Sequence, residues 1–210
     1  MAAQLHVMNA GQALGVWADR AVTAFPAAIG QINSHLAVDD LDIVLYASNG
    51  FMIIPELGMG GFSEHGHFIR LMLDPTNPHI EDGFRHAFEG LLTHECHHCM
   101  RERGPGYGKT LADSLIAEGL ACQFEREVTG RLPFYALPLS DEEVRNWRAR
   151  IDGDLQSDYQ PGWMFGDKSR GIERHFGYRL GSALVAEWLR SRGLTAAKAV
   201  HQPTAQFFPV

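Results

Sequence analysis

The chain has 210 residues, of which 45% are hydrophobic and 20% are charged, and its formal net charge at pH 7 is −7. This length and composition are those of one globular domain with a sizeable core. The acidic balance argues against a nucleic-acid binder or a polybasic membrane-surface protein. No apolar run reaches the ~20 residues of a membrane span, so neither nucleic acid nor membrane is an expected partner.

The first third of the chain alternates between strand and helix patterns. Strands are predicted over residues 3–8, 41–47 and 67–73. A helical pattern covers about residues 12–36, and we expect a break or kink in it at Pro26. The glycine-containing segment 55–61 fits no regular element, so we predict a loop there.

The rest of the chain has the pattern of helices. These are predicted over about residues 80–101, 111–128, 140–151 and 174–191. Gly130 and Gly193 fit helix ends, and Ser140 with Glu143 forms a capping-box signature. The segment 104–108 breaks the first two helices apart, and a loop through residues 161–166 is expected before the last one.

Strands early and helices late predict an α+β fold, with a small N-terminal sheet lobe packed on a helical C-terminal lobe. No internal repeat or long linker divides the sequence. We therefore expect a single domain over 1–210, with a mixed α/β lobe at about 1–78 and a helical lobe at about 79–210.

The segment His94-Glu95-Cys96-His97-His98 matches His-Glu-x-x-His in the middle of a predicted helix. Residues four apart lie on one helix face, so His94 and His98 can bind one metal ion. Glu95, about 100° further round, can take the proton of a metal-bound water. The alternative is a helix that happens to be rich in histidine.

A catalytic zinc needs a third protein ligand, and Glu118 is the best candidate. It lies 20 residues after His98, on a helix face that it shares with Leu111, Leu115 and Cys122. A carboxylate on an apolar face is unfavourable without a compensating charge, which zinc would supply. Gly119 would let the two helices approach closely. Pairing of Glu118 with an arginine is the alternative.

The two histidines followed by a glutamate on the next helix resemble the gluzincin metallopeptidases. More closely, the chain resembles a bacterial family of predicted zinc-dependent proteases of otherwise unknown function. The matching segments are residues 56–61, 94–98, 113–121, 163–166 and 177–181. The resemblance implies a gluzincin-like zincin core with the active-site helix between the lobes, one Zn²⁺ per chain, and peptide or small-protein substrates.

Further site residues follow from this resemblance. Tyr178, beside glycines in a matching segment, is the first choice as donor to the developing oxyanion, and core packing is its alternative role. Tyr107 and His175 compete for the same role. Gly60 and Gly61 precede an edge strand that would pair with substrate. The adjacent Glu64, His65 and His67 are candidates for its rim, although each is equally a surface residue.

The chain departs from thermolysin-like gluzincins at one position. Those enzymes carry an aspartate four residues after the third ligand, where this chain has Cys122. Asp113 is our substitute for the residue that orients a zinc histidine, and its alternative role is that of a solvated acid at a helix start.

Three cysteines, Cys96, Cys99 and Cys122, are too few for a disulfide framework, which indicates a reducing cytosol. The first seven residues lack the features of a signal peptide, so we expect a cytoplasmic protein. Cys96 and Cys99 form a C-x-x-C, but redox chemistry would place it at a helix start after a strand. We interpret them as core.

Two other functions stay open. Ligation by His94, His98, Cys99 and Glu118 would close the site to water and give a zinc-stabilised, non-catalytic interaction domain. The same water chemistry could also serve an amidohydrolase or esterase acting on a non-peptide substrate. The sequence does not indicate an oligomeric state.

Overall fold

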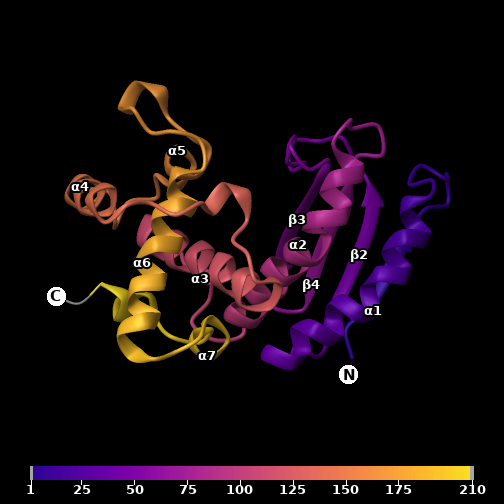
Figure 1. The fold of residues 1–210 in the computed structure, drawn as a ribbon, viewed down its shortest axis with the longest axis horizontal. Helices are drawn as coiled ribbons and strands as arrows, with labels where there is room; N and C mark the ends of the chain where they lie inside the picture. The colour runs from indigo at the N-terminus through magenta and orange to yellow at the C-terminus, as the bar shows by residue number, and fades with distance from the viewer. Residues whose placement is uncertain (1, 209–210) are drawn as a thin grey trace. The chain divides into compact units, whose positions relative to one another are not determined.

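The computed structural model describes residues 2–208 (Figure 1). The chain divides into two compact units, residues 1–100 and 101–210. Strands β1 to β4 belong to the first unit and helices dominate the second, which confirms the α+β class. Among residues 2–208, no helix combines the length and the apolar character needed to cross a bilayer. The expected single domain with a lobe boundary near residue 78 stays a prediction.

The first unit is built on a four-stranded sheet with the order β1-β2-β4-β3. Strands β1 (Gln4–Met8), β2 (Asp42–Ala47) and β4 (Phe68–Leu73) are parallel, and β3 (Met59–His65) runs antiparallel along β4 at the edge. Alternate apolar side chains of the two central strands are fully buried: Ile43, Leu45, Ile69 and Leu71. The predicted strands are therefore confirmed, and they turn one face to the core.

Helix α1 (Trp17–His35) connects β1 to β2, and it differs from the prediction at two points. It begins at Trp17 because Gln12 and Gly15 have φ angles of 58° and 52°, left-handed values that do not continue a helix. It also continues through Pro26, so the first of the two expected outcomes, a break, does not occur. The proline removes one backbone hydrogen bond, but its side chain lies on the exposed face and burial of Ile32 and the alanines of the other face holds the helix in place.

The glycines at 60 and 61 lie inside β3, so the prediction of a loop over residues 55–61 is wrong for its last three residues. Gly60 pairs with Met72 and Gly61 with Leu71. A side chain at residue 60 would place its Cβ 2.1 Å from the Met52 carbonyl oxygen. Glycine in a strand interior marks such a close approach of other groups.

The second unit centres on α3 (Leu111–Thr129) and α6 (Phe176–Arg192), and the end of α2 (Ile80–Glu102) opens it. A Cβ on Gly119 would stand 2.3 Å from the Gly181 carbonyl oxygen, so α3 and α6 meet with almost no space between their backbones. The predicted helix ends are confirmed: Gly130 and Gly193 follow the two helices with left-handed φ angles of 79° and 61°.

The predicted capping box of Ser140 and Glu143 is confirmed at the start of α4 (Asp141–Ile151). The segment predicted as a loop contains the short helix α5 (Gln160–Phe165), whose first turn accepts Pro161 because the amide that proline lacks is unpaired there anyway. The remaining short elements are α7 (Ala196–Ala199) and the 3₁₀ turns Phe134–Ala136, Lys168–Arg170 and Thr204–Phe207.

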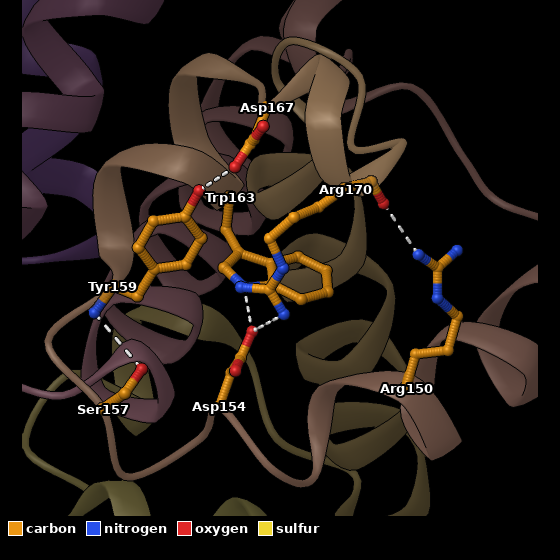
Figure 2. Close-up of polar contacts among 7 residues, drawn as sticks. All are labelled: Arg150, Asp154, Ser157, Tyr159, Trp163, Asp167 and Arg170. Carbon is orange, nitrogen blue, oxygen red and sulfur yellow. Dashed lines mark hydrogen bonds and ion pairs between the residues drawn. The ribbon is translucent and has the colours of Figure 1, made fainter.

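A polar network ties the α4–α5 connection together (Figure 2). The Asp154 carboxylate accepts hydrogen bonds from Trp163 Nε1 at 3.0 Å and from Arg170 Nη2 at 2.6 Å. The Tyr159 hydroxyl donates to Asp167, and Arg150 donates to the Arg170 carbonyl oxygen at 3.0 Å. The hydrogen bond from Ser169, followed by that from Tyr159, lowers the pKa of Asp167 to about 2. These side chains serve the structure of the second unit.

Candidate metal centre

Helix α2 presents His94, Glu95 and His98 as the spacing predicts. The motif lies inside the helix, and every residue from 91 to 100 is buried. The two imidazole rings are neighbours, with centroids 4.7 Å apart and an edge-on arrangement. Glu95 is only 6% exposed, so its carboxylate is largely withdrawn from bulk water.

Glu118 lies on α3 and is 7% exposed. The helix face that it shares with Leu111, Leu115 and Cys122 is apolar, as predicted, and is shielded from solvent, because these three residues have no exposed surface. One nitrogen of each histidine and one carboxylate oxygen of Glu118 lie within 4.8 Å of one another. The nearest neighbours of Gly119 belong to α6, so this glycine allows a close approach of α3 to α6, whereas the approach predicted for it was between α3 and the motif helix.

These three side chains fit a zinc ion. Two histidines and one glutamate are an established donor set for catalytic zinc, which leaves a fourth position for water or substrate. Tetrahedral coordination with bonds of about 2.0–2.2 Å separates ligand atoms by roughly 3.4 Å. Modest side-chain rotation would bring the observed donors to that separation. The group contains no cysteine, and this disfavours the closed site that would include Cys99.

Tyr107 contacts the third candidate ligand directly. Its hydroxyl donates a hydrogen bond to Oε1 of Glu118, and its backbone N–H donates to the Glu102 carboxylate at 2.9 Å. Gly106 and Gly108 flank it with φ angles of 81° and 83°, left-handed values that glycine adopts without strain. From the sequence, Tyr107 is only a competitor for the oxyanion role, since residue spacing alone does not reveal a contact with Glu118.

Tyr178 lies in an aromatic cluster of the second unit. Its half-buried ring has centroid separations of 5.1 Å from Tyr135 and 5.9 Å from His175, and it packs against the apolar core. His175, at the start of α6, has a φ of 66°, which is uncommon for a residue with a side chain. Burial raises the pKa of Tyr135 well above its usual value, and nearby acidic groups, led by Glu125, add to the shift. These contacts match the alternative role of Tyr178, which is packing in the core.

Asp113 closes the start of α3. Its carboxylate accepts hydrogen bonds from the backbone N–H groups of Lys109 and Thr110 at 3.1 Å, and from the Thr110 hydroxyl at 2.8 Å. Together with Thr110 it forms a capping box. These contacts match the alternative role of a helix-start acid, and the orientation of a zinc histidine by Asp113 stays a prediction.

The residues expected along the substrate edge lie on or beside β3. Gly61 stands directly against Glu95. Glu64 forms an ion pair with Arg70, and the His67 ring hydrogen-bonds the Asp40 carbonyl oxygen at 2.9 Å. Glu64, His65 and His67 are all surface residues in the structure.

All three cysteines lie in the interior without exposed surface. Cys99 Sγ lies 3.1 Å from the Ser63 hydroxyl and donates to the His65 carbonyl oxygen at 3.2 Å. Burial raises the pKa of the Cys122 thiol well above its usual value, and Glu118 and Glu125 raise it further. The thiols thus have the character of core residues, as predicted.

A comparison with protein families gives a match over most of the chain. The model of the family described as "Predicted Zn-dependent protease (DUF2268)" matches residues 21–208. No curated protein matches the chain.

Proposed function

The chain belongs to this family of predicted zinc-dependent proteases, and from that premise we propose that it is a gluzincin-type zinc hydrolase that cleaves peptide bonds. One observation carries the proposal: the ligand atoms of His94, His98 and Glu118 converge within 4.8 Å in buried surroundings. A structural zinc site would not require a glutamate next to its first histidine. Here Glu95 follows His94 and is itself buried.

His94, His98 and Glu118 would hold a single zinc ion. Such an ion, when bound, supplies a Lewis acid that acidifies water and polarises the substrate carbonyl. Histidine binds a metal ion through a neutral imidazole nitrogen, so Glu118 would contribute the one negative charge of the ligand set. A buried carboxylate requires compensation by positive charge, and a divalent cation would provide it.

Glu95 is the proposed general base. It accepts a proton from the attacking water and then delivers that proton to the leaving amine. Its position, one residue after His94 and three before His98, sets it about 100° round the helix from His94 and about 60° from His98, so it can reach the reacting water without being a ligand. Its burial keeps competing solvent away from this proton transfer.

Two tyrosines are proposed as hydrogen-bond donors to the developing oxyanion, and one observation favours the second of them. Tyr178 is the choice that the family resemblance implies. Tyr107 is favoured by its hydrogen bond to Glu118, since that contact places a phenolic hydroxyl at a proposed zinc ligand. A donor to the oxyanion typically contributes about 10²–10³-fold to kcat. Tyr107→Phe and Tyr178→Phe, compared at equal zinc content, therefore identify the donor.

The proposed substrate is an extended peptide or a small protein. Strand β3 forms the edge of its sheet, and the backbone of an edge strand is a template for pairing with another extended chain. Gly60 and Gly61 would contribute backbone to that pairing. The partner would then lie next to Glu95, because Gly61 contacts this glutamate.

The proposal is tested by zinc content and peptide cleavage in four proteins: wild type, Glu118→Ala, Glu95→Gln and the control Glu187→Ala, which changes an exposed glutamate of α6. Zinc is counted by plasma mass spectrometry, and cleavage of a peptide library is followed by mass spectrometry. We expect about one zinc per chain in all but Glu118→Ala, and loss of cleavage in Glu95→Gln with zinc retained.

Two results would contradict the proposal. Full zinc retention in Glu118→Ala would remove this residue from the ligand set. Zinc-dependent folding without cleavage in the wild type, and no measurable effect of Glu95→Gln, would instead identify a zinc-stabilised interaction domain.

A further inference from the structure

Gly61 lies on the edge strand β3 directly against the side chain of Glu95. A Cβ at residue 61 would stand 2.6 Å from Cγ, 2.7 Å from Oε1 and 3.0 Å from Cδ of Glu95. Non-bonded carbon atoms are in favourable contact only at about 3.5–4.0 Å. We propose that Gly61 is a positioning residue. Because it has no side chain, the Glu95 carboxylate can occupy the space that a Cβ at residue 61 would fill. This inference rests on the proposed function, in which Glu95 is the base.

The backbones of α2 and β3 are fixed relative to each other near this contact. Alternate residues of a strand point to the same face, so residues 61 and 63 both face α2. Glu95 meets Gly61, and one turn later Cys99 lies 3.1 Å from the Ser63 hydroxyl and donates to the carbonyl oxygen of His65. Helix and strand therefore cannot slide to relieve a clash at residue 61, and the Glu95 side chain has to rotate instead.

Rotation of the Glu95 side chain would move its carboxylate away from the position in which it would reach the water at the proposed zinc site. His94 and His98 lie on the same helix and are buried with it, so they would keep their place. Proton transfer requires heavy-atom separations of about 2.6–3.2 Å, and a displacement of about 1 Å can lower a rate 10²-fold. The size of the side chain at residue 61 therefore controls turnover through the position of Glu95, although that side chain contributes no chemical group to the reaction.

The backbone of Gly61 faces the other way, toward the open edge of the sheet. The Gly58 carbonyl oxygen accepts from the N–H of Asp74, which follows β4, whereas the Met59 carbonyl oxygen accepts from Ile54 on the opposite side. In an antiparallel ladder these directions alternate, so the N–H and C=O of Gly61 share the outward direction of Met59. A methyl group at residue 61 leaves these groups in place. Gly61→Ala is thus expected to lower kcat and to change KM little.

A double-mutant thermal cycle tests the contact without any activity measurement. Gly61→Ala, Glu95→Ala and the double variant are compared with wild type in zinc-containing buffer. We expect Gly61→Ala to lower the unfolding midpoint by ~5 °C in the wild-type background and by less than ~1 °C when residue 95 is alanine. The control Gly30→Ala, at an open position of α1, should shift the midpoint equally in both backgrounds.

Peptide cleavage then tests the functional part. At equal zinc content we expect Gly61→Ala to lower kcat per bound zinc at least ~10-fold with KM within about threefold of wild type, and Gly30→Ala to leave both unchanged. If Gly61→Ala does not fold, recovery of folding in Gly61→Ala/Glu95→Ala supports the contact. Failure of the double variant to fold, while Glu95→Ala alone folds, overturns it.

Equal midpoint shifts in the two backgrounds, or an undiminished kcat per bound zinc, would also overturn the positioning role. A wild-type protein that cleaves no peptide would instead overturn the proposed function, and the thermal cycle would still decide whether Glu95 occupies the side-chain space of residue 61.

Discussion

Replacing Tyr107 by phenylalanine removes one hydroxyl from the surroundings of the proposed third ligand. The hydroxyl donates to Oε1 of Glu118, and this hydrogen bond fixes the orientation of the carboxylate. Glu118 as a residue is 7% exposed, which leaves little water to take over this hydrogen bond. In Tyr107→Phe the zinc ion would have to order the carboxylate on binding, and the affinity should fall.

The expected size follows from the type of interaction. A hydrogen bond to a charged group contributes about 1.5–3 kcal/mol, and loss of a partner that orients a metal ligand typically weakens metal binding 10–100-fold. We therefore expect a 10–100-fold higher zinc dissociation constant in Tyr107→Phe. The ring is retained, so the packing of the loop should change little.

The affinity is measured by competition with a chromophoric zinc chelator, with Tyr178→Phe as the matched control. Tyr178 contacts Tyr135 and His175, and its substitution should leave the zinc dissociation constant within about twofold of wild type. A Tyr107→Phe protein that binds zinc as tightly as the wild type would refute the reasoning. So would an equal loss of affinity in both variants.

Three further predictions concern packing, pH and metal removal. Gly119→Ala should destabilise the protein by ~3 kcal/mol in urea unfolding, because its Cβ would stand 2.3 Å from the Gly181 backbone oxygen, and a stability within ~0.5 kcal/mol of wild type would contradict the close packing of α3 and α6. Burial alone would raise the pKa of Asp113, but hydrogen bonds from Thr204, Thr110 and Lys109 outweigh it and lower the pKa below its usual value. Ionised Asp113 therefore stabilises the fold above its unfolded pKa of about 3.9, and this contribution is lost as the pH falls through the lowered folded value. Wild type should then be more stable than Asp113→Asn at pH 6, with the difference shrinking toward pH 3, and a constant difference would count against the assignment. Zinc at 100 times its dissociation constant should stabilise the wild type by about 2.7 kcal/mol relative to chelated protein, and Glu118→Gln should lose most of this difference in thermal scans.

Local sequence signals were sufficient for the elements whose ends are determined by local chemistry. The box of Ser140 and Glu143 begins α4 where expected, and Gly130 ends α3, because capping depends on residues three or four positions apart. The His-Glu-x-x-His spacing likewise specifies a shared helix face without reference to the rest of the fold. Burial of Glu118 could also be predicted, since its helix face is otherwise apolar.

The features that were missed depend on groups distant in the sequence. Gly60 and Gly61 have the composition of a turn, but they pair with Met72 and Leu71 of β4. Glycine is needed in this strand because Met52 and Glu95 occupy the space that side chains would need. Tyr107 is one of several candidate tyrosines until the loop after α2 brings its hydroxyl to Glu118. Pro26 would end an isolated helix, but the buried face of α1 compensates for the lost hydrogen bond.

The buried acids on α3 favour the proposed metal site for a physical reason that is independent of the motif. Glu118 and Glu125 are seven residues apart, so they share one face of the helix, and each is 7% exposed. Their negative charge reaches the groups beside them, because both raise the pKa values of Cys122 and Tyr135 beyond the effect of burial. Two carboxylates withdrawn from water on one face are unfavourable for folding unless positive charge compensates them. A divalent cation bound by Glu118 would add positive charge beside this face, where one nitrogen each of His94 and His98 lies within 4.8 Å of a Glu118 carboxylate oxygen.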